Sequence, residues 1–274
     1  MTRYSGHLSK LSIKYQKHCS YFLHLDDETS ICLNDWIGQE VTIHFSGIIH
    51  CVYCGAKTKK SYSQGYCYIH SQRLARCDLC ILKPELCHFH QGTCREPQWG
   101  KDHCMQPHYI YLANSTGLKV GITRAHNLPQ RWLDQGAIQA IPIIKVNSRL
   151  QSGLIEVAIA KHIADKTNWR QLIREDSPSM DLIARARELL DQAKEDISTV
   201  VERFPDDVEF LPLDKVDEFK YPVDSYPDKI KSLGLDKSPM ISGKLLGIKG
   251  QYLLFSQGAF NVRKHTGYWV DMSA

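Results

Sequence analysis

Cysteine and histidine side chains gather in one stretch of the chain at spacings that suit a metal ion. Two residues separate Cys51 from Cys54, and Cys67 and His70 repeat this spacing after twelve further residues. In a structural zinc site each such pair forms a tight turn that directs two ligands at one ion, and the loop between the pairs completes a tetrahedron. We therefore predict that these four side chains bind one Zn²⁺.

A second set of the same residue types follows at once. It consists of two pairs with a shorter loop between them: Cys77, Cys80, Cys87 and His90. Four further residues compete for this site: His88, Cys94, His103 and Cys104. The pairs can also be crossed, with 51/54 and 77/80 on one ion and 67/70 and 87/90 on the other. Closed coordination by four protein ligands would make either ion structural. The alternative is a set of buried free cysteines.

The distribution of cysteines argues against disulfides. Eight of the ten lie between residues 51 and 104, interleaved with histidines, while Cys19 and Cys32 stand alone and read as buried apolar residues. Residues 1–10 are polar and contain no apolar run of signal-peptide length, and no run of about 18 uncharged apolar residues follows. We expect a cytoplasmic, soluble protein that binds metal and does not enter membranes.

A predicted β-hairpin after the cysteines carries a second group of chemical interest. Its strands are residues 108–113 (HYIYLA) and 118–122 (LKVGI), and Asn-Ser-Thr-Gly forms the turn. Arg131 follows on a predicted short helix, and Glu156 lies on a later one. Hydrolysis of a phosphodiester needs a base for the attacking water, a cation for the developing charge and a metal ion to polarise the phosphate. The hairpin and the two helices contain residues of these types.

This hairpin and its helices resemble the GIY-YIG endonuclease domain. Residues 109–111 (YIY) stand where that family has its first triplet, and residues 119–121 (KVG) stand where it has its second. The pattern continues through five more positions: Thr123, Asn127, Leu128, Arg131 and Glu156. The resemblance covers roughly residues 107–175. The whole sequence is also similar to an uncharacterised bacterial family in which a cysteine cluster precedes such a domain, through the stretches GTCREPQWG, LKVGITR and GIKGQYLLF.

The resemblance implies a metal-dependent phosphodiesterase or endonuclease. Tyr111 matches the tyrosine of the first triplet, Arg131 the phosphate-binding arginine, and Glu156 the glutamate that holds Mg²⁺ or Mn²⁺. Lys119 stands where the family has a tyrosine proposed as general base, and Gln135 stands where it has a histidine. A lysine has an ordinary pKa of about 10.4, so it can act as a base only if burial or a neighbouring charge lowers that pKa greatly. Otherwise it can bind phosphate.

The same residues also have interpretations in which they carry no function. A glutamate at position 156 is also typical of the solvated flank of an amphipathic helix, and an arginine at 131 of an ordinary surface. Six residues are candidates for contact with nucleic acid: Tyr109, Lys59, Lys60, Arg124, Arg263 and Lys264. The lysines lie inside the first predicted zinc loop, where charge can equally keep a loop soluble, and residues 263–265 read as an exposed turn. The net charge of +4 is compatible with a phosphate-bearing partner.

The elements that must position these side chains suggest an α+β fold. We divide the chain into an N-terminal β segment (1–50), a zinc-binding module (51–106), a GIY-YIG-like domain (107–175), an amphipathic helix (176–203), a Pro-rich acidic connection (204–240) and a C-terminal β segment (241–274). Asn127 and Ser177-Pro178 are the expected helix starts. The first and last segments can pair into one small barrel, with the helical part inserted between them.

Three functions follow from this reading. The first is a divergent GIY-YIG-type endonuclease with structural zinc, acting on DNA or RNA. The second is a zinc-containing protein that binds nucleic acid, such as structured RNA or tRNA, without cleaving it. The third is a scaffold for protein interaction, which only the zinc spacing suggests. The sequence names no protein partner.

Overall fold

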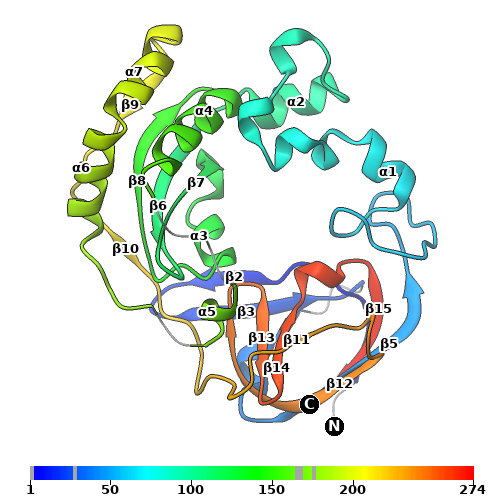
Figure 1. Cartoon of the computed structure of the whole chain (residues 1–274). Helices are drawn as coiled ribbons and strands as arrows, with labels where there is room; N and C mark the ends of the chain where they lie inside the picture. The colour runs from blue at the N-terminus through cyan, green and yellow to red at the C-terminus, as the bar shows by residue number, and fades with distance from the viewer. Residues whose placement is uncertain (1–2, 27–29, 164–168, 175–176) are drawn as a thin grey trace.

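The computed structural model describes residues 3–26, 30–163, 169–174 and 177–274. Two sheets and a helical layer make up most of it, so the predicted α+β class is confirmed. Figure 1 shows a seven-stranded sheet in blue, orange and red at the bottom and a second sheet in green above it. Residues 51–107, called the Cys/His segment below, run in cyan from the lower sheet to the upper one.

The lower sheet joins the two ends of the chain, as the sequence predicted. Its strands in spatial order are β1 (Arg3–His7), β15 (Tyr268–Ser273), β5 (Glu40–Ile49), β12 (Met240–Lys249), β13 (Tyr252–Phe255), β14 (Gly258–Asn261) and β11 (Ser232–Leu233). β1 is antiparallel to β15, with Arg3 opposite Ser273. The expected barrel does not close, because β1 and β11 are the two edges of this order in the described chain.

The core of the lower sheet extends into the upper half of the molecule. A small sheet of β2 (Ser12–Tyr15), β3 (Cys19–His24) and β4 (Ser30–Cys32) and a 3₁₀ turn, η1 (Leu33–Trp36), add to it. Cys19 is fully buried there, as the sequence predicted, whereas Cys32 is half-buried. Tyr111 and Trp132 of the upper half belong to the same hydrophobic cluster as Phe260 of the lower sheet. One core therefore links both halves.

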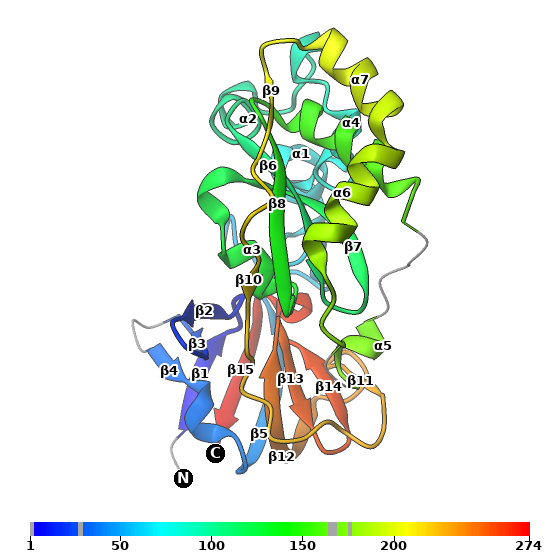
Figure 2. The same ribbon diagram turned by 90° about the vertical axis from the view of Figure 1, so that its left-hand side faces the viewer.

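The upper sheet contains the predicted hairpin. Its path is β10 (Asp217–Glu218), β8 (Gln139–Val146), β6 (His108–Asn114) and β7 (Leu118–Arg124), and β9 (Val208–Phe210) also pairs with β8. Figure 2 shows β9 and β10 running beside β8. Both strands come from the region expected to be an irregular connection. Extended, Pro-rich backbone can still add short edge strands where its N–H groups are free to pair.

Helices cover one face of the upper sheet. They are α4 (Arg149–Ala160), α6 (Leu182–Gln192) and α7 (Lys194–Arg203), while α3 (Gln130–Asp134) and α5 (Trp169–Leu172) lie elsewhere. The single long helix predicted over 176–203 is thus two helices. The two helices are separated at Ala193; α6 contacts β8, and α7 contacts α4.

Two predicted helix starts are wrong. The N-cap of α6 is Asp181, whose carboxylate accepts from the Ala184 N–H at 2.9 Å, and not Ser177-Pro178. Asn127 ends a 3₁₀ turn, η6 (Ala125–Asn127), and α3 begins only after Pro129. The predicted boundary at 175/176 lies outside the described residues.

Short helices and turns make up the Cys/His segment. They are α1 (Tyr68–Arg73), η2 (Ala75–Cys77), η3 (Leu79–Ile81), η4 (Pro84–Leu86), η5 (Phe89–Gln91) and α2 (Pro97–Cys104). η4 packs against α4 at Gly153, where an added Cβ would lie 2.3 Å from the Glu85 backbone nitrogen. The glycine therefore permits close contact between the segment and the upper sheet. In the described part of the chain, no helix has the length and apolar character needed to cross a membrane.

Candidate functional site

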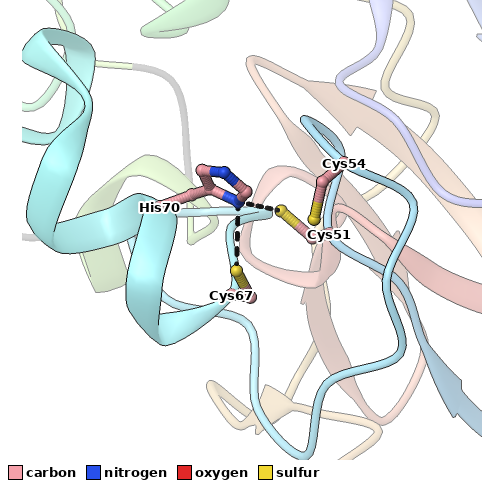
Figure 3. Close-up of side chains that lie close together, drawn as sticks. All are labelled: Cys51, Cys54, Cys67 and His70. Atoms are coloured by element: carbon pink, nitrogen blue, oxygen red, sulfur yellow. Dashed lines mark hydrogen bonds between the residues drawn. The ribbon is translucent and has the colours of Figure 1, made fainter.

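The first predicted ligand set is assembled at the start of the Cys/His segment. One ligand atom from each of Cys51, Cys54, Cys67 and His70 lies within 4.8 Å of the other three. The imidazole Nδ1 is 3.2 Å from the Cys67 sulfur and 3.7 Å from the Cys51 sulfur. Figure 3 shows the four side chains pointing toward one another. Three sulfurs and one imidazole nitrogen suit a metal ion such as zinc.

Local backbone geometry explains how these ligands converge. Cys51 lies two residues after the end of the long strand β5, and Gly55, with φ of +69°, closes the turn after Cys54 by donating its N–H to the Cys51 carbonyl at 2.8 Å. Only glycine adopts such a φ without strain. Cys67 directly precedes α1, so His70 lies on the first turn of that helix and faces back to the sulfur. The cluster is fixed to the lower sheet through the His50 N–H, which donates to the Gly267 carbonyl at 2.9 Å.

The electrostatics of the cluster favour a thiolate. Burial raises the pKa of Cys51, but backbone N–H groups of Cys67, Cys54 and Tyr53, together with His70, outweigh it and bring the pKa to about 6. Cys54 is exposed, and its pKa is raised: the Ala56 backbone N–H lowers it, but desolvation and the neighbouring Cys51 and Cys67 sulfurs outweigh that effect. A divalent cation would remove the repulsion between these sulfurs, since metal binding requires deprotonated thiols.

The second predicted set is not brought together as a group of four. Cys77 lies near Ser63, beside the first cluster. His90 is exposed and borders a pocket with Met105 and Phe204. Cys80 and Cys87 lie deeper in the segment, around a different small cavity. The two cysteine pairs are not crossed as in the alternative arrangement, because 51/54 meet 67/70, whereas Cys80 meets Asp78 and His88 in a separate group of three.

A second site lies where the Cys/His segment, the upper sheet and the lower sheet meet. It is a pocket of about 290 Å³ that contains four arginines and one glutamate: Arg124, Arg131, Arg149, Arg263 and Glu156. They come from four elements: Arg124 from β7, Arg131 from α3, Arg149 and Glu156 from α4, and Arg263 from η7 (Arg263–His265). Ile81, Leu82 and Pro84 of the Cys/His segment form another wall.

Like charges are held close together in this arginine pocket. The pKa of Arg263 lies below its ordinary value because of burial and the nearby Arg131 guanidinium, and that of Arg124 because of burial and Arg149. Burial raises the pKa of Glu156 to about 7, although Arg131 and Arg149 oppose that effect. A group of half-buried cations with one carboxyl is a ready-made site for a phosphate-sized anion.

Hydrogen bonds fix the orientation of Arg131. With the Gln135 amide oxygen turned to Arg131, it accepts from Nη2 at 3.1 Å and from Nε at 3.2 Å, and the amide nitrogen donates to the Tyr111 hydroxyl at 2.8 Å. Tyr111 is fully buried and packs across Gly121, where a Cβ would lie 2.7 Å from its hydroxyl oxygen. Tyr111 is thus a support for Arg131 and does not border the pocket. Burial raises the pKa of its hydroxyl.

The surroundings of Lys119 lower the pKa of its side chain, as a role as a base would require. Burial, followed by the charge of Arg131, lowers the pKa of its ammonium to about 8. A substantial fraction is therefore neutral at slightly alkaline pH. Lys119 is half-buried on β7, where it pairs with Ala113 of β6, two positions along from the Tyr111–Gly121 pair, and it is not among the residues that line the arginine pocket.

The remaining predicted residues are dispersed. Lys59 is exposed and borders a separate pocket of about 900 Å³ with His44 and Asp236, and Lys60 is exposed beside Tyr62. Tyr109 is half-buried on β6, and Lys264 is exposed. The turn at 263–265 is not wholly exposed as predicted, because His265 is fully buried and hydrogen-bonded on both ring nitrogens.

Arg149 is the site residue that sequence reasoning missed. It is held by the Ile81 and Cys80 carbonyls, which accept from its guanidinium at 2.7 Å and 3.3 Å. A signal was present, since residues seven apart share one face of a helix and Arg149 precedes Glu156 by that spacing on α4.

Comparison with known proteins identifies one relationship. A family model described as a protein of unknown function (DUF2797) matches residues 38–270, which run from just before β5 into β15. No curated protein and no solved structure shows a significant match to the chain.

Proposed function

We propose, from the premise that this chain belongs to the DUF2797 family of proteins of unknown function, that it is a nucleic-acid phosphodiesterase of the GIY-YIG type. The observation that carries this proposal is the convergence of four arginines and Glu156 in one pocket. Two of the residues that the family resemblance singles out, Arg131 and Glu156, meet there although 25 positions separate them in the chain.

The arginines would bind the phosphate backbone. A guanidinium presents donors in a planar fork that matches phosphate oxygens, and it stays charged in a half-buried setting. Gln135 and the Ile81 carbonyl fix the orientations of Arg131 and Arg149 before any ligand arrives. Prior orientation lowers the entropy lost on binding and directs the cations at charge that develops during the reaction.

Glu156 is the residue suited to hold Mg²⁺ or Mn²⁺. Mg²⁺ commonly binds one or two carboxylates and completes its shell with water and substrate phosphate oxygens. Glu156 is the one carboxylate bordering the pocket in the described chain, so these residues fit the ion only together with a phosphate. When bound, the ion would polarise the phosphate and stabilise the leaving oxygen. For the ion to bind, the Glu156 carboxyl, whose pKa is about 7, must lose its proton.

Lys119 would receive the proton of the attacking water. With a pKa of about 8 it has a usable neutral form, which an ordinary lysine lacks. Lys119→Arg separates this role from phosphate binding, since arginine keeps the charge but cannot lose it. We expect wild-type cleavage to rise from pH 7 to pH 9 and Lys119→Arg to lose cleavage. An active Lys119→Arg variant would show that the residue only binds phosphate.

We further propose that zinc occupies the cluster of Cys51, Cys54, Cys67 and His70 as a structural ion. Four protein ligands leave no open coordination position for substrate. Its role would be to hold the start of the Cys/His segment on the lower sheet, so that the segment can form one wall of the arginine pocket.

The decisive experiment measures cleavage and binding together. Purified protein is incubated with labelled single-stranded DNA, branched DNA or tRNA in Mg²⁺ or Mn²⁺, beside Glu156→Gln and a matched control, Glu188→Gln, on the exposed face of α6. We expect cleavage by the wild type and by the control and at least about 100-fold less by Glu156→Gln, which should still bind. Undiminished cleavage by Glu156→Gln would refute the assignment.

Binding without cleavage is the second candidate, and one observation favours it. Four cations against one carboxyl leave the arginine pocket with an excess of positive charge, which attracts nucleic acid but repels a metal ion. Under this reading affinity falls with salt, and Arg131→Gln lowers the slope of log K against log salt by about 1, whereas Arg187→Gln on the exposed face of α6 does not. Absence of any salt-dependent binding would exclude both functions.

A further inference from the structure

A second group of cysteines surrounds a very small cavity inside the Cys/His segment. Four cysteines border it: Cys80, Cys87, Cys94 and Cys104. Its volume is about 10 Å³, about the space that one water-sized particle occupies. Three of these cysteines are buried and Cys94 is half-buried, so the sulfurs face a closed interior and not the solvent.

The four cysteines that border the cavity come from η3, α2 and the connections between the short elements. The side chains of Cys87 and Cys104 are neighbours. The Cys94 sulfur lies 2.9 Å from the position of a Cβ built on Gly100, so only glycine there leaves it room. Gly100 and Cys104 are one turn apart on α2, which brings Cys94 and Cys104 to the same side of that helix. Cys80 enters from η3.

Ligand atoms of Asp78, Cys80 and His88 lie within 4.8 Å of one another at this cavity, but Asp78 and His88 already have other partners. The Asp78 carboxylate accepts from Arg95 Nε at 2.6 Å and from the Cys80 N–H at 3.1 Å, where it caps η3. His88 Nδ1 is 2.7 Å from the Thr93 hydroxyl. His103, a further competitor from the sequence, is stacked on Trp99 and bonded to its carbonyl oxygen at 2.9 Å.

We propose that Cys80, Cys87, Cys94 and Cys104 form a second structural zinc centre with four thiolate ligands. The set keeps two of the four residues that spacing suggested and replaces Cys77 and His90 by Cys94 and Cys104. Binding replaces four S–H bonds by four Zn–S bonds and releases four protons, with no change of oxidation state. The ion would draw the four sulfurs inward to about 2.3 Å from the metal.

The charges around the cavity suit such a centre. Zn²⁺ with four thiolates carries a net charge of −2, which is costly to bury without cations nearby. The Arg149 guanidinium donates to the Cys80 carbonyl at 3.3 Å, and Arg95 borders the cavity. Since Arg149 also borders the arginine pocket, the second zinc would fix one of its walls.

Metal content tests the ligand set. The full chain is purified with zinc, freed of loose metal, and its zinc measured per chain by mass spectrometry. We expect two ions in the wild type, in Cys77→Ser, in His90→Gln and in His88→Gln, and one ion in Cys94→Ser and in Cys104→Ser. One ion in the wild type would overturn the centre, and so would one ion in His88→Gln or two in Cys94→Ser.

A measurement on the unaltered chain covers the case in which a variant does not fold. The native protein is alkylated with iodoacetamide before and after treatment with a strong zinc chelator, and each modified cysteine is mapped. The four proposed ligands should be protected before chelation and modified after it. Half-buried Cys77 should react in both conditions, and fully buried Cys19 should stay protected in both. Modification of Cys94 and Cys104 before chelation would overturn the proposal.

Discussion

The Cys/His segment and the two sheets are stabilised in different ways. In the described chain, the three hydrophobic clusters include residues of both sheets and their helices, but none from residues 51–107. The segment instead exposes large apolar side chains, among them Leu82 at 81% and Tyr68 at 61%. A segment of this length without a core of its own needs another source of stability. Metal coordination is that source under our proposal, and the following predictions test the contrast.

Removal of metal should have the largest effect, and it should be confined to the segment. Structural zinc contributes about 10–16 kcal/mol in isolated zinc-finger peptides at neutral pH, more than the whole stability of a typical domain. After chelation we expect hydrogen exchange in α1 and α2 to lose its protection while β6 and β8 keep theirs. Loss of protection in both regions together would show that they unfold as one unit.

Truncation of a side chain to alanine should destabilise the protein strongly in the core of the sheets and only weakly in the Cys/His segment. Phe260 is fully buried in the lower sheet, and Phe260→Ala should lower the free energy of unfolding by about 3–5 kcal/mol. The matched change in the segment, Leu82→Ala, should cost less than about 0.5 kcal/mol, because Leu82 is exposed. Urea denaturation measures both values, and zinc content should be the same in both variants. Equal costs would contradict the contrast.

The contact between the two regions should respond to a single methyl group. Gly153→Ala places a Cβ against the backbone of Pro84 and Glu85, and we expect it to destabilise by about 1–3 kcal/mol. A glycine-to-alanine change in a free helix would stabilise by about 0.5–1 kcal/mol. Ala184→Gly on the exposed face of α6 is the control and should show only this propensity. A more stable Gly153→Ala variant would mean that η4 and α4 are not in contact.

The smallest predicted effect is a pH dependence in the lower sheet. Burial lowers the pKa of His265, whose Nε2 accepts from the Leu235 N–H at 3.2 Å. Below about pH 6.5 the unfolded chain takes up a proton here that the folded chain resists, so the free energy of unfolding falls as the pH decreases. Urea denaturation at pH 7.5 and 5.5 should show a smaller fall in His265→Gln than in the wild type. Protonation of zinc ligands affects both proteins alike, so an identical fall would refute the role of His265.

Some parts of this molecule could be predicted from sequence because their signals are local. The hairpin around residues 114–117, the first metal set and the strand character of the two terminal segments depend on periodicity and short spacings. The second ligand set could not be found in this way, because a repeated spacing favoured Cys77 and His90, whereas the chain path brings Cys94 and Cys104 to the cavity. Spacing describes how close two ligands can be, and not which way a turn faces.

The arginine pocket shows the same limit at longer range. Arg131 and Glu156 were proposed from a family resemblance, while Arg263 was expected in an exposed turn without relation to them. Its place in the pocket depends on how the lower sheet packs under the upper one, through a core that Tyr111 and Phe260 share. Arg149 was missed although helical spacing alone links it to Glu156. The environment that lowers the pKa of Lys119 also arises only after this packing.

The pairing of β1 and β5 with β15 has a consequence for how the chain is made. Arg3 and Ser273 are opposite each other, so their contact waits until the ribosome has synthesised almost everything in between. Until then β5 is a long strand with unpaired edges, in a topology whose distant contacts make folding slow. The upper sheet and the Cys/His segment contain mainly nearer contacts and can form earlier. The lower sheet is therefore the last part to mature, and the stage most exposed to aggregation of nascent chains.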